Sequence, residues 1–162
     1  VTCDWLERTP IQGSNSTSPD DENQVNGFIS EYLAAHKKLY PDTHQDAVTF
    51  FEEDSSLRRR RAGLVFIESY RELPLLAWPR KLISTLIELE ESMILWRSSH
   101  ARMVERMIGR RIGTGGSSGV DYLDMTTKYR VFIDLWAVRS VLIKKEALPP
   151  LKNPDFYEFK GE

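Results

Sequence analysis

The fold of this chain is decided by residues 82–107, which read LISTLIELEESMILWRSSHARMVERM. No proline or glycine interrupts the stretch, and large apolar residues recur in it at alternating spacings of four and three. This spacing is typical of one face of a packed α-helix, so we expect one long helix within residues 76–111. Its expected buried seam consists of Leu82, Leu86, Leu89, Met93, Trp96, His100, Met103 and Met107.

Apolar periodicity on both sides of this stretch predicts further helices, and no alternating strand pattern or internal repeat is present. The segment Leu64–Ile67 is apolar on every side and is therefore expected to be buried all round. The sequence thus predicts an all-α chain with two long helices, shorter ones and no sheet. The additional helices are expected at residues 28–40, 44–53, 57–73 and, as the second long one, 126–145.

Three polar segments have their own expectations. Residues 11–26 lack periodic apolar positions and are rich in turn formers, which predicts a flexible surface loop. The run Arg58–Arg61 opens a helix, where positive charge opposes the helix dipole. We expect a solvated helix end that meets nearby carboxylates, with contact to an anion, a partner or nucleic acid as alternatives. Glu88, Glu90 and Glu91 are expected on the exposed face of the long helix.

The composition excludes several classes of protein. The chain has 162 residues, 41% hydrophobic and 28% charged, which is typical of a globular domain. A net charge of −2 gives no general attraction to nucleic acid or to anionic lipid. The single cysteine, Cys3, forms no intrachain disulfide and no Cys-rich zinc site. No apolar run is long enough to span a membrane and no signal peptide is visible, so we expect a cytoplasmic location.

Two of the three histidines, His36 and His44, lie in polar surroundings and are expected at the surface. The third, His100, lies in the apolar seam and leaves two interpretations open. It is either a buried neutral histidine with satisfied hydrogen bonds or a lone axial ligand to a haem iron. Zinc would need three or four ligands, and no second His or Cys stands at ligand spacing. The neighbouring Trp96, Met103 and Met107 suit a protein core or the wall of a flat apolar cofactor.

A glycine-rich segment, GTGGSSG, occupies residues 113–119. It lacks the lysine of a phosphate-binding loop, and no strand precedes it as a dinucleotide site requires. It is either a flexible connection or a loop that closes over a ligand with its amides and hydroxyls. The histidines are too few and too poorly placed for a Ser-His-Asp arrangement, so no catalytic residue is assigned.

Taken together, the segment around His100 and the glycine-rich segment resemble one protein family. Residues 96–109 (WRSSHARMVERMIG) followed by 113–119 are similar to the C-terminal half of tryptophan 2,3-dioxygenases. Residues 5–10 (WLERTP) and 129–136 (YRVFIDLW) resemble further segments of that family.

The resemblance implies an all-helical haem dioxygenase of the indoleamine/tryptophan dioxygenase type, usually a homotetramer. Such an enzyme inserts O₂ across the indole C2–C3 bond of L-tryptophan and yields N-formylkynurenine, a step of tryptophan catabolism in the kynurenine pathway. By the same resemblance, His100 is the axial ligand of the haem iron and Thr114 contacts the substrate. The residues expected to let the loop close are Gly113, Gly115, Gly116 and Ser117, and those expected to wall the haem are Trp96, Met103 and Met107.

The chain begins at Val1 rather than Met, which suggests either a trimmed start or a partial chain. The resemblance favours the second, since the family's distal pocket comes from an N-terminal half that has no counterpart here. We therefore expect residues 1–162 to be one all-helical C-terminal portion that is incomplete without that half, supplied by the same or another chain. Two alternatives remain: a non-catalytic helical haem-binding module, or a secondary-metabolism relative that oxidises a substituted tryptophan, sometimes with one oxygen atom.

Overall fold

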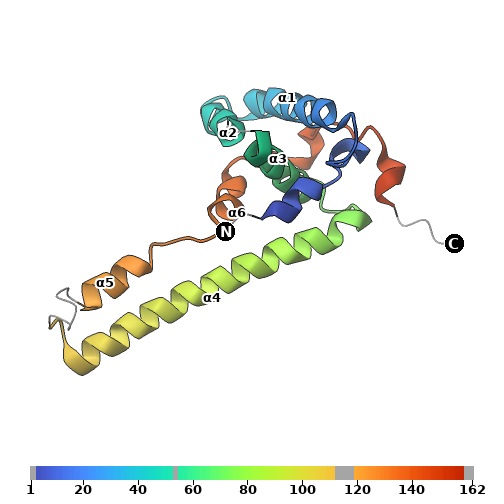
Figure 1. The fold of residues 1–162 in the computed structure, drawn as a ribbon. Helices are drawn as coiled ribbons and strands as arrows, with labels where there is room; N and C mark the ends of the chain where they lie inside the picture. The colour runs from blue at the N-terminus through green and yellow to red at the C-terminus, as the bar shows by residue number, and fades with distance from the viewer. Residues whose placement is uncertain (1–2, 53–54, 112–118, 159–162) are drawn as a thin grey trace. The chain divides into compact units, whose positions relative to one another are not determined.

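The computed structural model describes residues 3–52, 55–111 and 119–158. Every regular element in these ranges is helical, which confirms the expected all-α class (Figure 1). None of the described helices is long and apolar enough to cross a membrane. The α-helices are α1 (Asp21–Leu39), α2 (His44–Phe51), α3 (Ser55–Ser69), α4 (Ala77–Ile108), α5 (Gly119–Thr126) and α6 (Ile133–Ala137). The 3₁₀ helices are η1 (Asp4–Arg8), η2 (Ile11–Gly13), η3 (Pro74–Leu76), η4 (Val138–Ser140), η5 (Lys145–Ala147) and η6 (Pro154–Tyr157).

The chain divides into two compact units. The first unit combines Val1–Ile83 with Asp134–Glu162, and the second is Ser84–Ile133. The long helix α4 therefore begins in the first unit and contributes most of its length to the second.

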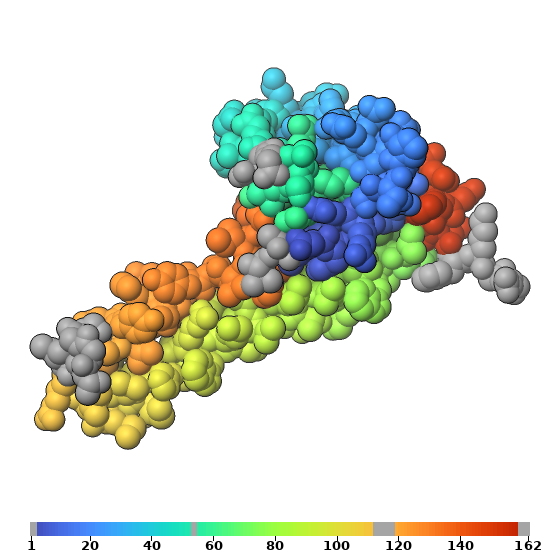
Figure 2. All heavy atoms as spheres, viewed as in Figure 1, coloured from blue at the N-terminus to red at the C-terminus, as the bar shows by residue number. Residues whose placement is uncertain are grey.

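The core of the first unit is an aromatic cluster built on α1 and α3. The ring of Phe66 lies 5.3 Å from that of Phe28, 4.6 Å from Tyr70 and 5.6 Å from Tyr157, measured between centroids. These distances are typical of favourable aromatic pairs. All of Leu64–Ile67 is fully buried, as the sequence predicted. Figure 2 shows the atoms of α1, α2 and α3 closely packed on the viewed face of this unit.

The arginine run at the start of α3 meets carboxylates as expected, but its end of the helix is not solvated, since Arg59 is buried and Arg60 and Arg61 are largely covered. Because the partners lie in η1, in the first turn of α1 and at the start of α6, the run joins sequence-distant segments of the first unit. Arg59 pairs with Asp21 at 2.9 Å, Arg60 with Glu7 at 2.7 Å and Arg61 with Asp134 at 2.9 Å.

The prediction of a flexible loop over residues 11–26 is wrong at both ends of that range. Ile11 and Gln12 are buried in the turn η2, where the Gln12 amide donates to Pro150 O at 3.2 Å. At the other end, α1 begins at Asp21 and buries Val25. The polar residues Asp21 and Glu22 do not oppose a helix, because acidic side chains in a first turn interact favourably with the helix dipole.

The C-terminal segment of the first unit is held to the core by buried tyrosine hydroxyls. Burial raises the pKa of Tyr32 and of Tyr157 to about 12, and it also raises the pKa of Tyr70. These hydroxyls therefore remain protonated donors at neutral pH. Tyr32 donates to Val141 O at 3.0 Å, Tyr70 to Pro149 O at 2.6 Å, and Tyr157 to Pro10 O.

The second long helix expected over residues 126–145 is not formed. In its place α5 ends at Thr126 and the five-residue α6 begins at Ile133. Side chains of α4 take up the intervening backbone groups. Arg97 donates to Thr126 O and to Tyr129 O, each at 3.2 Å, and Glu90 accepts from the amides of Val131 and Phe132.

His36 was expected at the surface but is buried in the first unit. It follows Tyr32 by one helical turn and so shares the inward face of α1. Its ring lies 5.4 Å from that of Tyr40 and 5.9 Å from that of His44, and its Nδ1 makes no hydrogen bond within the described residues. Burial lowers the pKa of His36, the nearby His44 lowers it further, and Asp46 partly opposes the shift.

We expect the stability of the first unit to fall as the pH drops below about 6.5, the ordinary pKa of histidine. A histidine whose pKa is lowered by folding binds a proton more readily when unfolded, so acid favours the unfolded state. One such group changes the free energy of unfolding by at most about 1.4 kcal/mol per pH unit. Urea unfolding at pH 5.5 and 7.5 measures the difference. His36→Gln should reduce it, and an unchanged difference would contradict the assignment to His36.

Candidate functional site

The seam expected to be buried on α4 is instead largely exposed. Trp96 is 66% exposed and Met107 is 76% exposed, while Leu89, Met93 and Met103 are also open to solvent. The inward face lies one residue further along the helix, where Glu90 and Ala101 are almost completely buried. Glu90 was expected on the exposed face, so that prediction is wrong as well. The predicted spacing is correct, but its position around the helix is shifted by one residue.

His100 lies on this exposed stripe and is itself half-buried. Its imidazole stacks on the indole of Trp96, with ring centroids 5.3 Å apart and planes 15° from parallel. Within the described part of the chain, neither ring nitrogen makes a hydrogen bond. The geometry therefore differs from that of a core histidine with satisfied nitrogens, and it leaves the imidazole available as a ligand.

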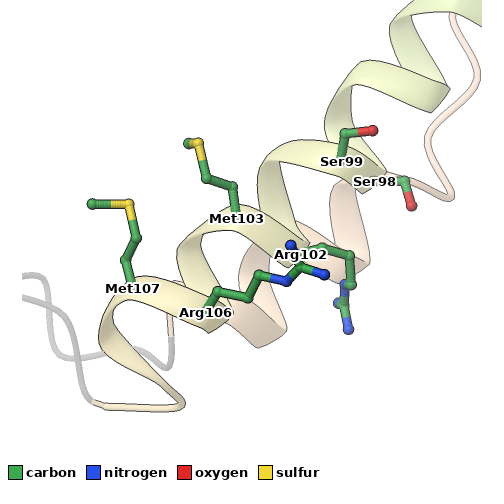
Figure 3. A pocket seen from close by; sticks show the side chains of 6 residues that line it. All are labelled: Ser98, Ser99, Arg102, Met103, Arg106 and Met107. Carbon is green, nitrogen blue, oxygen red and sulfur yellow. The ribbon is translucent and has the colours of Figure 1, made fainter.

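An open groove runs along the C-terminal half of α4 beside this stripe (Figure 3). Its volume is about 470 Å³. The side chains of Met103 and Met107 project together on one side, and those of Arg102 and Arg106 extend away from them on the other. The groove thus has an apolar side and a cationic side. Its lining residues are Ser98, Ser99, Arg102, Met103, Arg106 and Met107.

These residues fit the requirements of a haem. A haem needs one axial imidazole, a broad apolar surface against its macrocycle and polar groups for its carboxylates. The exposed stripe offers His100 as the imidazole, Trp96 and the methionines as the apolar surface, and the arginines of the groove as cations. Among the described residues, no three His, Cys, Asp or Glu side chains gather into a metal site.

The residues assigned to the substrate loop, which are Gly113, Thr114, Gly115, Gly116 and Ser117, lie outside the described residues. The described flanks of this segment are joined to each other. Arg110 pairs with Asp121 of α5 at 3.0 Å, and Arg102 pairs with Asp124. Figures 1 and 2 show α5 beside the C-terminal part of α4. The described residues on either side of the segment therefore lie close together in the second unit.

The family model for tryptophan 2,3-dioxygenase matches residues 5–142. The chain belongs to this family. The match includes all four segments on which the resemblance rested, so the all-helical dioxygenase fold is confirmed together with the family.

Curated relatives in this family match almost the whole chain. Tryptophan 2,3-dioxygenase 2 of Ralstonia nicotianae is 44% identical over 193 residues, which cover 98% of this chain and 51% of that protein. A tryptophan 2,3-dioxygenase-like protein of Xanthomonas campestris pv. campestris is 44% identical, and the match covers 98% of this chain and 69% of that protein. Tryptophan 2,3-dioxygenase of Rattus norvegicus is 30% identical, and the match covers 96% of this chain and 45% of that protein. The chain thus spans about half the length of several of these tryptophan dioxygenases.

Sequence reasoning missed the structural role of two polar residues of the second unit, Glu90 and Arg97. Both lie on the inward face of α4 and bind the backbone that follows α5. The signal for them was a second stripe with the same spacing, one residue further along, in which charged residues interrupt apolar ones. Charged residues in an apolar stripe are informative because they are rarely buried without partners.

Proposed function

We propose that this chain supplies the proximal side of a haem-dependent tryptophan 2,3-dioxygenase. The reaction is the insertion of both atoms of O₂ across the indole C2–C3 bond of L-tryptophan, which yields N-formylkynurenine in the kynurenine pathway of tryptophan catabolism. The observation that carries the proposal is an outward apolar stripe with an available histidine at its centre, in a member of this family.

In this proposal each residue of the stripe has one task. The imidazole of His100 binds the haem iron as its axial ligand, and the stacked indole of Trp96 restricts the orientation of that ring. Met103 and Met107 cover the macrocycle and exclude water from it. The bound haem supplies the activation of O₂, which no side chain of this stripe can provide.

Thr114 is proposed to contact the amino acid part of tryptophan through its hydroxyl and backbone amide. Gly113, Gly115, Gly116 and Ser117 are proposed to let the chain around it close over the substrate, because small residues allow a backbone to approach a ligand closely. The rest of the pocket is assigned to the additional length that the relatives have, on the same or another chain. Assembly as a homotetramer is part of the proposal.

A second candidate function is a helical haem-binding module without catalysis. The described residues offer an imidazole and an apolar surface to haem, and none of them is assigned to tryptophan. A module of this kind would bind haem through His100 and would not turn over tryptophan. The two candidates differ only in whether a complementary segment completes the site.

The deciding experiment supplies that segment. The chain is combined with the N-terminal remainder of the Ralstonia nicotianae enzyme, haemin, a reductant, L-tryptophan and ¹⁸O₂. The dioxygenase proposal expects the absorbance of N-formylkynurenine and a product that carries two labelled oxygen atoms. A product with one labelled atom would favour the relatives that insert a single oxygen. Haem binding without any product would favour the non-catalytic module.

In the same assay we expect Thr114→Ala to raise the apparent KM for tryptophan by roughly tenfold, the effect of about 1.4 kcal/mol from one lost hydrogen bond. The matched control is Thr127→Ala, since the Thr127 hydroxyl donates to Asp124 O within the second unit and has no proposed role in binding. If both variants keep the parent KM, Thr114 is not part of the substrate site.

A further inference from the structure

In the second unit, α4 carries two stripes of identical spacing that lie one residue apart. The outward stripe is large and apolar apart from one histidine, whereas the inward stripe contains two charged residues and an alanine. Hydrophobic burial alone would turn the outward stripe inward, because it offers more apolar surface. The outward stripe is Leu86, Leu89, Met93, Trp96, His100, Met103 and Met107. The inward stripe is Ile87, Glu90, Ile94, Arg97, Ala101 and Val104.

Glu90 and Arg97 have partners that only the inward position provides. The two residues are seven positions apart and so share one face of the helix. Arg97 Nη1 donates to Thr126 O and to Tyr129 O, each at 3.2 Å. The Glu90 carboxylate is 1% exposed and accepts from the amide of Val131 and, at 3.3 Å, from that of Phe132.

These contacts bind backbone groups at the end of α5 and in the segment that follows it. Residues 127–132 belong to no helix, and the amides of Val131 and Phe132 donate to the Glu90 carboxylate. A rotation of α4 by one residue, about 100°, would bury the outward stripe and remove both side chains from this backbone. The Glu90 carboxylate, which is almost completely buried, would then lose the amides that donate to it, and a buried charged group is costly to leave without donors.

We propose that Glu90 and Arg97 set the rotation of α4 about its axis and thereby keep the His100 stripe facing outward. They are positioning residues: they touch neither haem nor substrate, and they act by deciding which stripe the chain covers with its own backbone. Buried polar residues that fix the register of a helix are a recognised use of such groups. The part of the inference that concerns haem rests on the proposed function, whereas the part that concerns rotation does not.

The rotation is tested by thiol accessibility in the full chain. With Cys3 replaced by serine, a single reporter is introduced either inward, as Ala101→Cys, or outward, as Met103→Cys. In the parent, the outward reporter should react with a thiol reagent severalfold faster than the inward one. In the Glu90→Leu/Arg97→Leu variant this order should be lost or reversed. Glu91→Leu is the matched control, because it removes an exposed carboxylate next to Glu90 and should keep the parent order.

Circular dichroism first establishes that the double variant keeps its helix content. If it does not, Glu90→Gln and Arg97→Lys are used instead, since the first keeps the shape of the side chain and the second keeps its positive charge. We expect Glu90→Gln to reduce the difference in reaction rate between the two reporter thiols, and Arg97→Lys to preserve most of that difference. The inference is overturned if the outward thiol still reacts faster than the inward one by the same factor as in the parent, either in a folded double variant or in Glu90→Gln used in its place.

Haemin titration separates this inference from the proposed function. If the parent binds haemin through His100, the double variant should bind it severalfold more weakly and Glu91→Leu should bind it normally. Equal haemin affinity in the parent and the folded double variant would overturn the proposed link between rotation and the haem site. If the parent binds no haemin, the proposed function fails, and the thiol reactivities still decide whether Glu90 and Arg97 set the rotation.

Discussion

Replacing Arg59 by alanine is expected to lower the free energy of unfolding by about 3–5 kcal/mol, the usual cost of removing one partner of a buried ion pair. The side chains of Arg59 and Asp21 are 11% and 14% exposed. Their two hydrogen bonds are each 2.9 Å long, and the same guanidinium donates to Thr9 O at 2.7 Å. The substitution leaves a largely covered carboxylate and a buried carbonyl without this donor, and it removes the polar link of α3 to α1 and to the segment after η1.

Arg60→Ala is the matched control, because it removes the neighbouring arginine of the same run. Arg60 pairs with Glu7 and with the well-exposed Asp4, so its loss should cost no more than about 1 kcal/mol. Urea unfolding followed by circular dichroism measures both variants. Equal losses for the two arginines would contradict a special role for the buried pair.

Replacing His100 by glycine is expected to reduce the formation of N-formylkynurenine roughly 100-fold or more in the completed, haem-loaded enzyme. Loss of even an outer partner of a metal ligand costs about 10–100-fold, so loss of the only axial ligand from this stripe should cost at least as much. The substitution leaves a space beside Trp96 that matches an imidazole ring. Added imidazole should therefore enter it, bind the iron and restore part of the rate.

The rescue distinguishes ligation from packing. Imidazole should restore the rate of His100→Gly and leave that of the parent unchanged, and His44→Ala on α2 should behave like the parent in both conditions. A rate that survives in His100→Gly without imidazole would contradict the assignment of His100 as the axial ligand. A rate that is lost and not rescued would point to a packing role.

The parts of the fold that depend on local pattern were predictable from sequence. The long helix follows from uninterrupted spacing at residues 82–107, and the buried turn Leu64–Ile67 follows from its apolar composition. The rotation of that helix was not predictable from the same spacing. We infer that the more apolar stripe faces outward because Arg97 and Glu90 bind backbone that lies 29 and 41 residues further along the chain, contacts that periodicity does not reveal.

The remaining errors have the same origin. The stripe Val131, Leu135, Val138 and Leu142 predicts a continuous helix, yet the backbone before α6 is bound by side chains of α4. The polar residues around His36 predict a position at the surface, yet His36 lies on the inward face of α1 and is buried. In both cases a tertiary contact outweighs local preference.

For the candidate site, the sequence placed His100, Trp96, Met103 and Met107 on one face of one helix, and the structure does the same. Spacing alone left a core histidine and a haem ligand as alternatives, because both occur in apolar stripes. The family resemblance assigned the roles, and the comparisons confirmed the family. The contacts of the substrate loop could not follow from a glycine-rich composition, which permits many conformations.

The most direct test of the central claim is a titration of haemin into the full chain, followed by absorbance and carried out in parallel with His100→Ala. We expect the parent to shift the Soret band and to give the spectrum of a histidine-ligated haem, and we expect the variant to lose that spectrum. No Soret shift in the parent, or the same shift in His100→Ala, would contradict the claim that this stripe holds haem through His100.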